Sequence, residues 1–184
     1  MAEFRLETDR LILRSWRDED WQPFFAGTNT PDGMRWLGGV MDQAKQDWQR
    51  ARFEGYEREF GFTFWAMEQK ADAALLGTCG LKRANLEGGP QGDVEIGWRL
   101  NERYWGQGFA HEAAAATLNH AFGTLDARHV LALTVQGNAP SWGLMLRLGM
   151  ERAADLDFDS GECDPHDGRI IVHCITRERW NQLT

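Results

Sequence analysis

Two closely spaced glycines, Gly106 and Gly108, separate a strand-like run from an alanine-rich helical run. The run at 93–100 alternates as a strand does, and the helical run begins directly after the glycines, at Phe109. Glycine lets backbone N–H groups turn towards a ligand, and the N-terminus of a helix carries roughly half a positive charge. The junction therefore predicts an anion-binding site.

The composition narrows the class of protein. A length of 184 residues predicts a single domain over 1–184, with a sizeable core. The hydrophobic share of 42% is ordinary for a globular protein, and no apolar run is long enough to cross a membrane. The first residues lack the apolar core of a signal peptide, so we expect a cytoplasmic location and no membrane partner. The formal charge of -8 argues against nucleic-acid binding and favours a cationic substrate.

The cysteines and histidines do not form a metal-binding pattern. Cys79, Cys163 and Cys174 are odd in number and widely scattered, and two of them lie in apolar runs, so we expect buried free thiols. The five histidines show no paired ligand spacing. We therefore expect no metal site.

The rest of the chain must position the glycine junction. Apolar alternation predicts strands at 10–16, 62–68, 74–82, 93–100, 128–135, 155–159 and 169–175. Helices are expected from about 18 to 25, from 42 to 59, from 109 to 122, and from 138 or 139 to 148, where Pro140 fits the first turn and Gly149 follows the end. No internal repeat is present.

This order of elements predicts a mixed α/β fold of the α+β kind. Hairpins make a central, twisted and mostly antiparallel sheet of about seven strands, with helices on both faces. The helix at 109–122 links two strands by a parallel crossover.

The order of elements, with the glycine junction in its middle, resembles the GCN5-related N-acetyltransferases (GNAT). Three motifs resemble the branch that contains the ribosomal-protein alanine and serine N-acetyltransferases. They are Glu7-Thr8-Asp9-Arg10-Leu11-Ile12-Leu13-Arg14, Tyr104-Trp105-Gly106-Gln107-Gly108-Phe109-Ala110 with Glu112-Ala113, and Asn138-Ala139-Pro140-Ser141 ahead of Leu148-Gly149-Met150. Trp105 stands where the general motif has Gln or Arg, and it matches this branch.

The resemblance implies acetyl-CoA as cosubstrate and assigns residues to it. Its pyrophosphate would be cradled by backbone N–H groups of Gly106, Gln107, Gly108, Phe109, Ala110 and His111. The backbone of Trp98, Arg99 and Leu100 would lie beside the pantetheine arm. Asn138 matches a position that contacts the pantetheine or the thioester, although a helix cap explains it equally well.

Acetyl transfer to an amine needs a base, because an alkyl ammonium has a pKa of about 10 and cannot attack a thioester until it loses its proton. Glu95 is the candidate base, acting directly or through a water; the alternative is a polar residue on an alternating strand. Met145 occupies the position of the family's usual tyrosine acid, so Ser141 or water is the candidate acid. The alternative for Ser141 is a residue that only starts the helix.

The sequence leaves the identity of the acceptor amine open. Trp36 and Trp65 are candidate walls of the acceptor site, although core packing explains Trp65 equally well. The resemblance implies direct attack by a primary amine in a ternary complex, and the amine belongs to a peptide N-terminus, such as that of a ribosomal protein, or to a small molecule. It is also compatible with a homodimer. The rival interpretation is a non-catalytic acyl-CoA-binding or sensing module.

Overall fold

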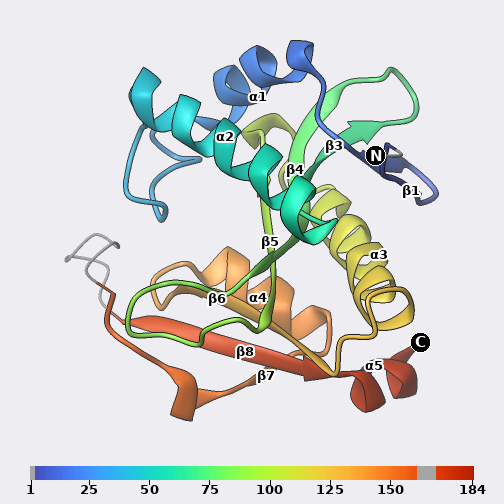
Figure 1. Cartoon of the computed structure of the whole chain (residues 1–184), viewed down its shortest axis with the longest axis vertical. Coiled ribbons are helices and arrows are strands. Elements are labelled where there is room, and N and C mark those ends of the chain that lie inside the picture. The colour runs from blue at the N-terminus through green and yellow to red at the C-terminus, as the bar shows by residue number, and fades with distance from the viewer. Residues whose placement is uncertain (1–2, 161–168) are drawn as a thin grey trace.

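One eight-stranded sheet organises the residues that the structure describes, in the order β1-β2-β3-β4-β5-β6-β8-β7 (Figure 1). The structure is a computed structural model that describes residues 3–160 and 169–184. The strands are β1 (Arg5–Glu7), β2 (Leu11–Arg14), β3 (Phe64–Gln69), β4 (Leu75–Arg83), β5 (Val94–Leu100), β6 (His129–Val135), β7 (Glu151–Arg152) and β8 (Ile170–Thr176). The helices are η1 (Asp18–Asp20), α1 (Trp21–Thr28), α2 (Gln43–Phe60), η2 (Glu102–Tyr104), α3 (Phe109–Gly123), α4 (Ala139–Arg147), η3 (Ala154–Leu156) and α5 (Arg177–Leu183).

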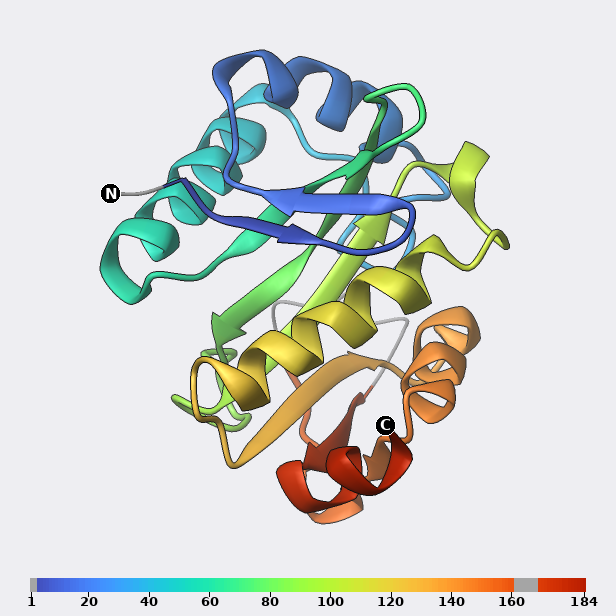
Figure 2. The ribbon, with the colours of Figure 1, turned by 90° about the vertical axis from the view of Figure 1, so that its right-hand side faces the viewer.

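The pairing of the strands confirms the predicted fold class. Neighbouring strands pair antiparallel along the described sheet except for β5 and β6, which pair parallel. The α3 helix makes the crossover between these two strands, as the alanine-rich run predicts. The single β5–β6 register pair is Glu95 with Leu131, and the two strands diverge beyond it (Figures 1 and 2).

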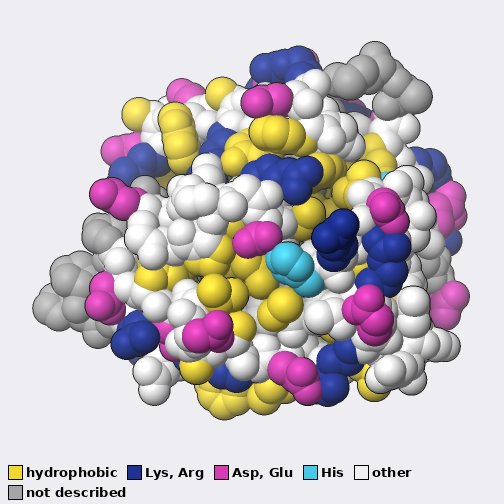
Figure 3. All heavy atoms as spheres, turned by 60° about the horizontal axis from the view of Figure 1, so that its bottom comes forward, with side chains coloured by type: hydrophobic (Ala, Val, Ile, Leu, Met, Phe, Trp, Pro, Cys, Tyr) yellow, Lys and Arg dark blue, Asp and Glu magenta, His cyan; other side chains and the backbone are white. Residues whose placement is uncertain are grey.

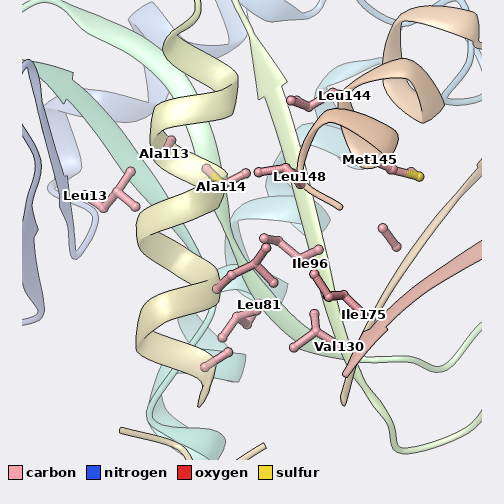
Figure 4. Close-up of a cluster of buried hydrophobic side chains, with 14 of the residues drawn as sticks. Leu13, Leu81, Ile96, Ala113, Ala114, Val130, Leu144, Met145, Leu148 and Ile175 are labelled. Atoms are coloured by element: carbon pink, nitrogen blue, oxygen red, sulfur yellow. The ribbon is translucent and has the colours of Figure 1, made fainter. Parts of the chain in front are cut away.

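Helices cover both faces of the sheet, and α2 and α3 lie on opposite sides of it (Figures 1 and 2). On one face, α3 packs into the main core, where Ala113 and Ala114 are fully buried against larger side chains such as Ile96 (Figure 4). Their small size lets the helix approach the strands closely. On the other face, α1 and α2 contribute an aromatic cluster of Trp21, Phe24 and Phe53. No helix in the described part of the chain is long and apolar enough to cross a membrane.

The C-terminal region differs from the prediction at 155–159, which is not a strand. Asp157 there accepts a hydrogen bond from the backbone N–H of Val172 at 3.0 Å and pairs with Arg152. A carboxylate thus takes a backbone donor that a neighbouring strand would have used. The short strand lies earlier, at β7, and Phe158 keeps only an isolated bridge to Ile170.

A strand and a helix near the two ends of the described chain also lie outside the predicted set. The β1 strand pairs with β2, and Phe4 beside it stacks on Trp65 at 3.8 Å. The α5 helix begins at Thr176, whose hydroxyl accepts a hydrogen bond from Arg179 N at 3.2 Å. Trp180 anchors this helix in the main core and donates to Asn119 Oδ1 at 2.8 Å. Short elements such as these contain too few residues for a clear hydrophobic period. They form because they pair with a neighbouring strand or pack into the core, which the sequence does not show.

Candidate functional site

The divergence of β5 and β6 opens one edge of β5. Past the pair of Glu95 with Leu131, β5 continues to Leu100 and β6 continues to Val135 without further register pairs in the described sheet. The other edge of β5 stays fully paired with β4 as far as Leu100. An unpaired strand edge presents N–H and C=O groups that an extended ligand can bind. Glu95 lies at the closed end of this opening.

The glycine loop has the geometry that the anion-site prediction requires. Gly106 has φ 72° and Gly108, the residue before α3, has φ 82°, so both adopt the left-handed region that favours glycine. Among the described residues, none accepts a hydrogen bond from the backbone N–H groups of 106–111. These donors and the N-terminus of a long helix together can bind a phosphate group.

A long-range ion pair holds this loop in place. Glu112 in the first turn of α3 accepts hydrogen bonds from Thr8 Oγ1 at 2.5 Å, from Arg10 N at 2.8 Å and from Arg10 Nε at 2.6 Å. Arg10 also donates to the carbonyl of Gln107 at 3.1 Å and lies over the ring of Phe109. The β1–β2 turn thus fastens the loop and adds a cation beside it.

The charge of Glu112 is favoured by these contacts. Burial alone raises the pKa of Glu112, but the hydrogen bonds from Thr8 and Arg10 outweigh burial and lower the pKa below its ordinary value. Thr8 and Arg10 belong to the first of the three sequence motifs but were not predicted to lie at the site. Their separation from Glu112 by about a hundred residues gives no local signal.

Glu95 is a buried carboxylate with an incomplete set of partners. Only 7% of the residue is exposed, and Lys82, its neighbour on β4, lies 3.0 Å from Oε2. Apart from this ion pair, Oε2 has no partner among the described residues. Burial raises the pKa of Glu95, and the positive charges of Lys82 and Arg52 oppose that rise without reversing it. A carboxylate whose pKa is raised is a stronger proton acceptor than an ordinary one.

The end of β5 sends its side chains to two different faces. Trp98 and Leu100 pack against the α3 side of the core, whereas Arg99 contacts α1 and α2 on the other side. The carbonyl of Leu100 accepts a hydrogen bond from Trp105 Nε1 at 2.9 Å. Trp105 therefore ties the glycine loop to the end of β5, which gives a structural role to the tryptophan in the motif.

The α4 helix brings Asn138 and Ser141 to the open end of β6. Asn138 precedes the helix, but its side chain makes no cap; its Nδ2 donates to Thr134 Oγ1 at 3.0 Å. The backbone carbonyl of Asn138 accepts from Ser141 N at 3.1 Å instead. Ser141 is partly exposed, and its hydroxyl has no hydrogen-bond partner among the described residues. Met145 is buried in the main core.

The two candidate acceptor-wall tryptophans lie in different environments. Trp36 is half-buried in the segment after α1, and its ring lies so close to Gly137 that an added Cβ would meet it at 2.7 Å. This places Trp36 beside the turn that leads to Asn138. Trp65 is fully buried in the main core, where it stacks on Phe4 below α3. The structure therefore keeps these two side chains in separate regions.

Other reactive side chains do not join this site. Cys79 is a buried free thiol and Cys174 is a partly exposed one, while Cys163 lies outside the described residues. No group of histidine, cysteine, aspartate and glutamate within 3–160 and 169–184 is placed to hold a metal ion. A hollow of about 470 Å³ lies between β7, β8 and α5, but none of the candidate site residues line it. The surface at the bottom of Figure 1, which comes forward in Figure 3, mixes acidic, basic and hydrophobic side chains.

Comparison with known proteins gives a family for this chain. Residues 10–151 match the family model described as an acetyltransferase (GNAT) domain. The chain is 32% identical over 154 residues to the uncharacterized protein YkkB of Bacillus subtilis, covering 81% of this chain and 86% of that protein.

Solved structures show the same fold. An acetyltransferase from Agrobacterium tumefaciens has a TM-score of 0.81 at 22% identity, with 96% of each chain covered. A ribosomal-protein-S5-alanine acetyltransferase from Vibrio fischeri has a TM-score of 0.72 at 14% identity, with 96% of this chain and 98% of that chain covered.

Proposed function

The chain belongs to the GNAT family of acetyltransferases, and from that premise we propose that it transfers the acetyl group of acetyl-CoA to a primary amine by direct attack in a ternary complex. The observation that carries the proposal is the position of Glu95. It lies where β5 and β6 begin to diverge, on the strand that leads into the glycine loop. A cofactor-binding edge and a proton acceptor thus meet on one strand.

The residues around the opening fit acetyl-CoA, which would supply an acetyl thioester. The free N–H groups of 106–111 and the N-terminus of α3 suit the pyrophosphate, and the guanidinium of Arg10 adds positive charge beside them. The open backbone edge from Trp98 to Leu100 suits the amides of the pantetheine arm. No described residue donates a hydrogen bond to the side-chain oxygen of Asn138, so this oxygen can accept one from the ligand at the far wall.

Glu95 would remove the proton that keeps the acceptor amine unreactive. An alkyl ammonium has a pKa of about 10, so most of it is protonated at neutral pH. Burial raises the pKa of Glu95 and brings its carboxylate closer to the range in which a general base works. The proton passes to Glu95 directly or through a water. Lys82 holds the carboxylate in place from the neighbouring strand.

The departing thiolate of CoA needs a proton in turn. Ser141 has a hydroxyl without a described hydrogen-bond partner at the start of α4, close in sequence to Asn138. We assign this proton transfer to Ser141 or to water. Met145, at the position of the family's usual tyrosine, cannot supply this proton because a thioether has none to donate.

The acceptor would approach from the face of the sheet that α1 and α2 cover. Glu95 and Arg99 are four residues apart on β5, so their side chains share that face. Trp36 is retained as a wall of the acceptor site, since it lies beside the turn before Asn138. Trp65 is left out, since its complete burial on the α3 side keeps it from a ligand. The acceptor is a peptide N-terminus or a small-molecule amine.

The test of this function is Glu95→Gln. Turnover should fall by about 10²–10⁴-fold, the usual contribution of a general base, while acetyl-CoA binds as tightly as before. The wild-type rate should fall as pH drops through the raised pKa of Glu95, and the variant should lack that limb. Glu59→Gln, on the exposed end of α2, is the matched control and should change neither property. An unchanged pH–rate profile in Glu95→Gln would remove Glu95 from the base role.

A further inference from the structure

Arg99 is a buried cation without a carboxylate partner among the described residues. It is 8% exposed, and its Nη1 donates to Met34 Sδ at 3.0 Å while Nη2 donates to Gln49 Oε1 at 2.7 Å. Its guanidinium also lies 4.6 Å from the centre of the Phe24 ring. A guanidinium has five N–H donors, and a thioether is a weak acceptor. These two contacts therefore leave most of the guanidinium N–H donors without a strong acceptor among the described residues, and an anion could bind them.

Arg14 shows how the same chain satisfies a buried arginine. Arg14 is 3% exposed, and its guanidinium donates to both carboxylate oxygens of Asp20 at 2.6 and 2.8 Å and to Glu68 at 2.8 Å. Hydrogen bonding to Asp20 raises the pKa of Arg14, whereas burial lowers the pKa of Arg99 to about 10. A buried charge without a counter-ion destabilises the folded protein, so a bound anion would relieve this cost.

The surroundings of Arg99 are suited to one small planar anion. Gln49 accepts from Arg99 through its oxygen, which leaves its NH₂ group as a second donor nearby. Met34 and Phe24 supply apolar walls from the segment after α1 and from α1 itself. Donors inside apolar walls bind a carboxylate more strongly than the same donors in water, because the local dielectric constant is low.

Arg99 also lies on the same strand face as the candidate base. Glu95 and Arg99 are four residues apart on β5, so their Cα atoms are about 13 Å apart along the strand. Gly97 between them carries no side chain, and the ring of Phe64 lies against it as an apolar surface. One extended molecule can therefore place an amine near Glu95 and an anionic group near Arg99.

We propose that Arg99 binds a carboxylate of the acceptor, so that the acceptor is a short peptide or amino-acid derivative that carries a free carboxylate several bonds from its amine. The proposal rests on the acetyl-transfer function given above. It departs from the preference for cationic amines that the net charge of -8 suggests, because a local buried charge outweighs a dispersed surface field.

The experiment compares dipeptides that have a free C-terminus with the same dipeptides amidated at the C-terminus, which leaves the amine unchanged. The wild-type kcat/KM should favour the free acids by about 10- to 100-fold, as expected for charged hydrogen bonds. Arg99→Met should lose this preference by slowing only the acids, and Arg99→Lys should keep part of it. Arg58→Met, exposed on α2, is the control and should keep the full preference.

Two further measurements separate this role from a structural one and from the proposed function. Arg99→Met should melt at the same temperature as the wild type or higher, because it removes an uncompensated buried charge. N-acetylated dipeptide acids should bind the complex of the protein with CoA more tightly than their amides, as titrated by calorimetry, even without turnover. Equal binding of acid and amide to the wild type, or an acid preference that survives in Arg99→Met, would overturn the proposal. Acid-selective binding without any acetyl transfer would instead refute the proposed function alone.

Discussion

Gly106→Ala isolates the backbone geometry of the glycine loop from every other property of the site. Gly106 has φ 72°, and a Cβ built on it meets no atom within 4 Å, so alanine adds no clash. What remains is the cost of the left-handed conformation, about 1–2 kcal/mol for a residue other than glycine. Gly61, which ends α2 with φ 74°, has equally open surroundings and is the matched control.

The same backbone strain should weaken acetyl-CoA binding in Gly106→Ala and lower the melting temperature in Gly61→Ala. Gly106 is itself exposed, so an alanine there can leave the left-handed region in the free protein while Arg10 and Trp105 hold the rest of the loop. The strain is then felt when the N–H groups must turn to the pyrophosphate. A cost of 1–2 kcal/mol corresponds to an affinity for acetyl-CoA that is about 5- to 30-fold weaker. The N–H of Gly61 closes its helix on Glu57 O, so Gly61→Ala should instead lower the melting temperature by about 2–8 °C and leave the affinity unchanged.

Calorimetric titration with acetyl-CoA, together with thermal melting of both variants, checks this crossed pattern. Titration with CoA alone should give the same ratio of affinities, because the loop is assigned to the pyrophosphate and not to the acetyl group. Wild-type affinity in Gly106→Ala, or an equal loss in both variants, would refute the assignment of the loop.

Three further outcomes follow from the packing and the ionisation of named residues. Glu112→Gln should cost about 1–3 kcal/mol of stability at neutral pH. The difference should shrink as pH falls through the lowered pKa of Glu112, because protonation then removes the same charge from the wild type; a pH series of melting curves checks this. Gly80→Ala should destabilise by about 1–3 kcal/mol in denaturant titrations, because its Cβ would lie 2.0 Å from the Thr63 carbonyl oxygen. Cys79 should stay unlabelled by iodoacetamide at neutral pH until the protein unfolds, because burial raises its pKa to about 12.

Local patterns were sufficient to predict the glycine loop. The spacing of Gly106 and Gly108, an alternating run before them and an alanine-rich run after them each concern neighbours in the chain. The structure adds a left-handed backbone at both glycines and a helix that begins directly after them. Fold class, the parallel crossover and the core helices were predictable for the same reason.

Contacts between distant segments were not predictable from one sequence. Arg14 and Arg99 both lie in strands with apolar neighbours, yet only the folded chain shows that Asp20 satisfies one and that no described carboxylate satisfies the other. Trp36 and Trp65 were both candidate walls of the acceptor site because a single sequence does not show which distant segment each ring packs against. The anchoring of Glu112 by Arg10 likewise joins segments about a hundred residues apart in the chain.

The most direct test of acetyl transfer is the release of CoA thiol from acetyl-CoA in the presence and absence of amines. The amine product is weighed by mass spectrometry in the same reactions. Transfer predicts release that depends on the amine, one acetyl group gained for each thiol released, and loss of both in Glu95→Gln with acetyl-CoA binding retained. Tight binding of acetyl-CoA with no amine-dependent release, across peptides and small amines, would contradict an enzyme and indicate an acyl-CoA-binding module.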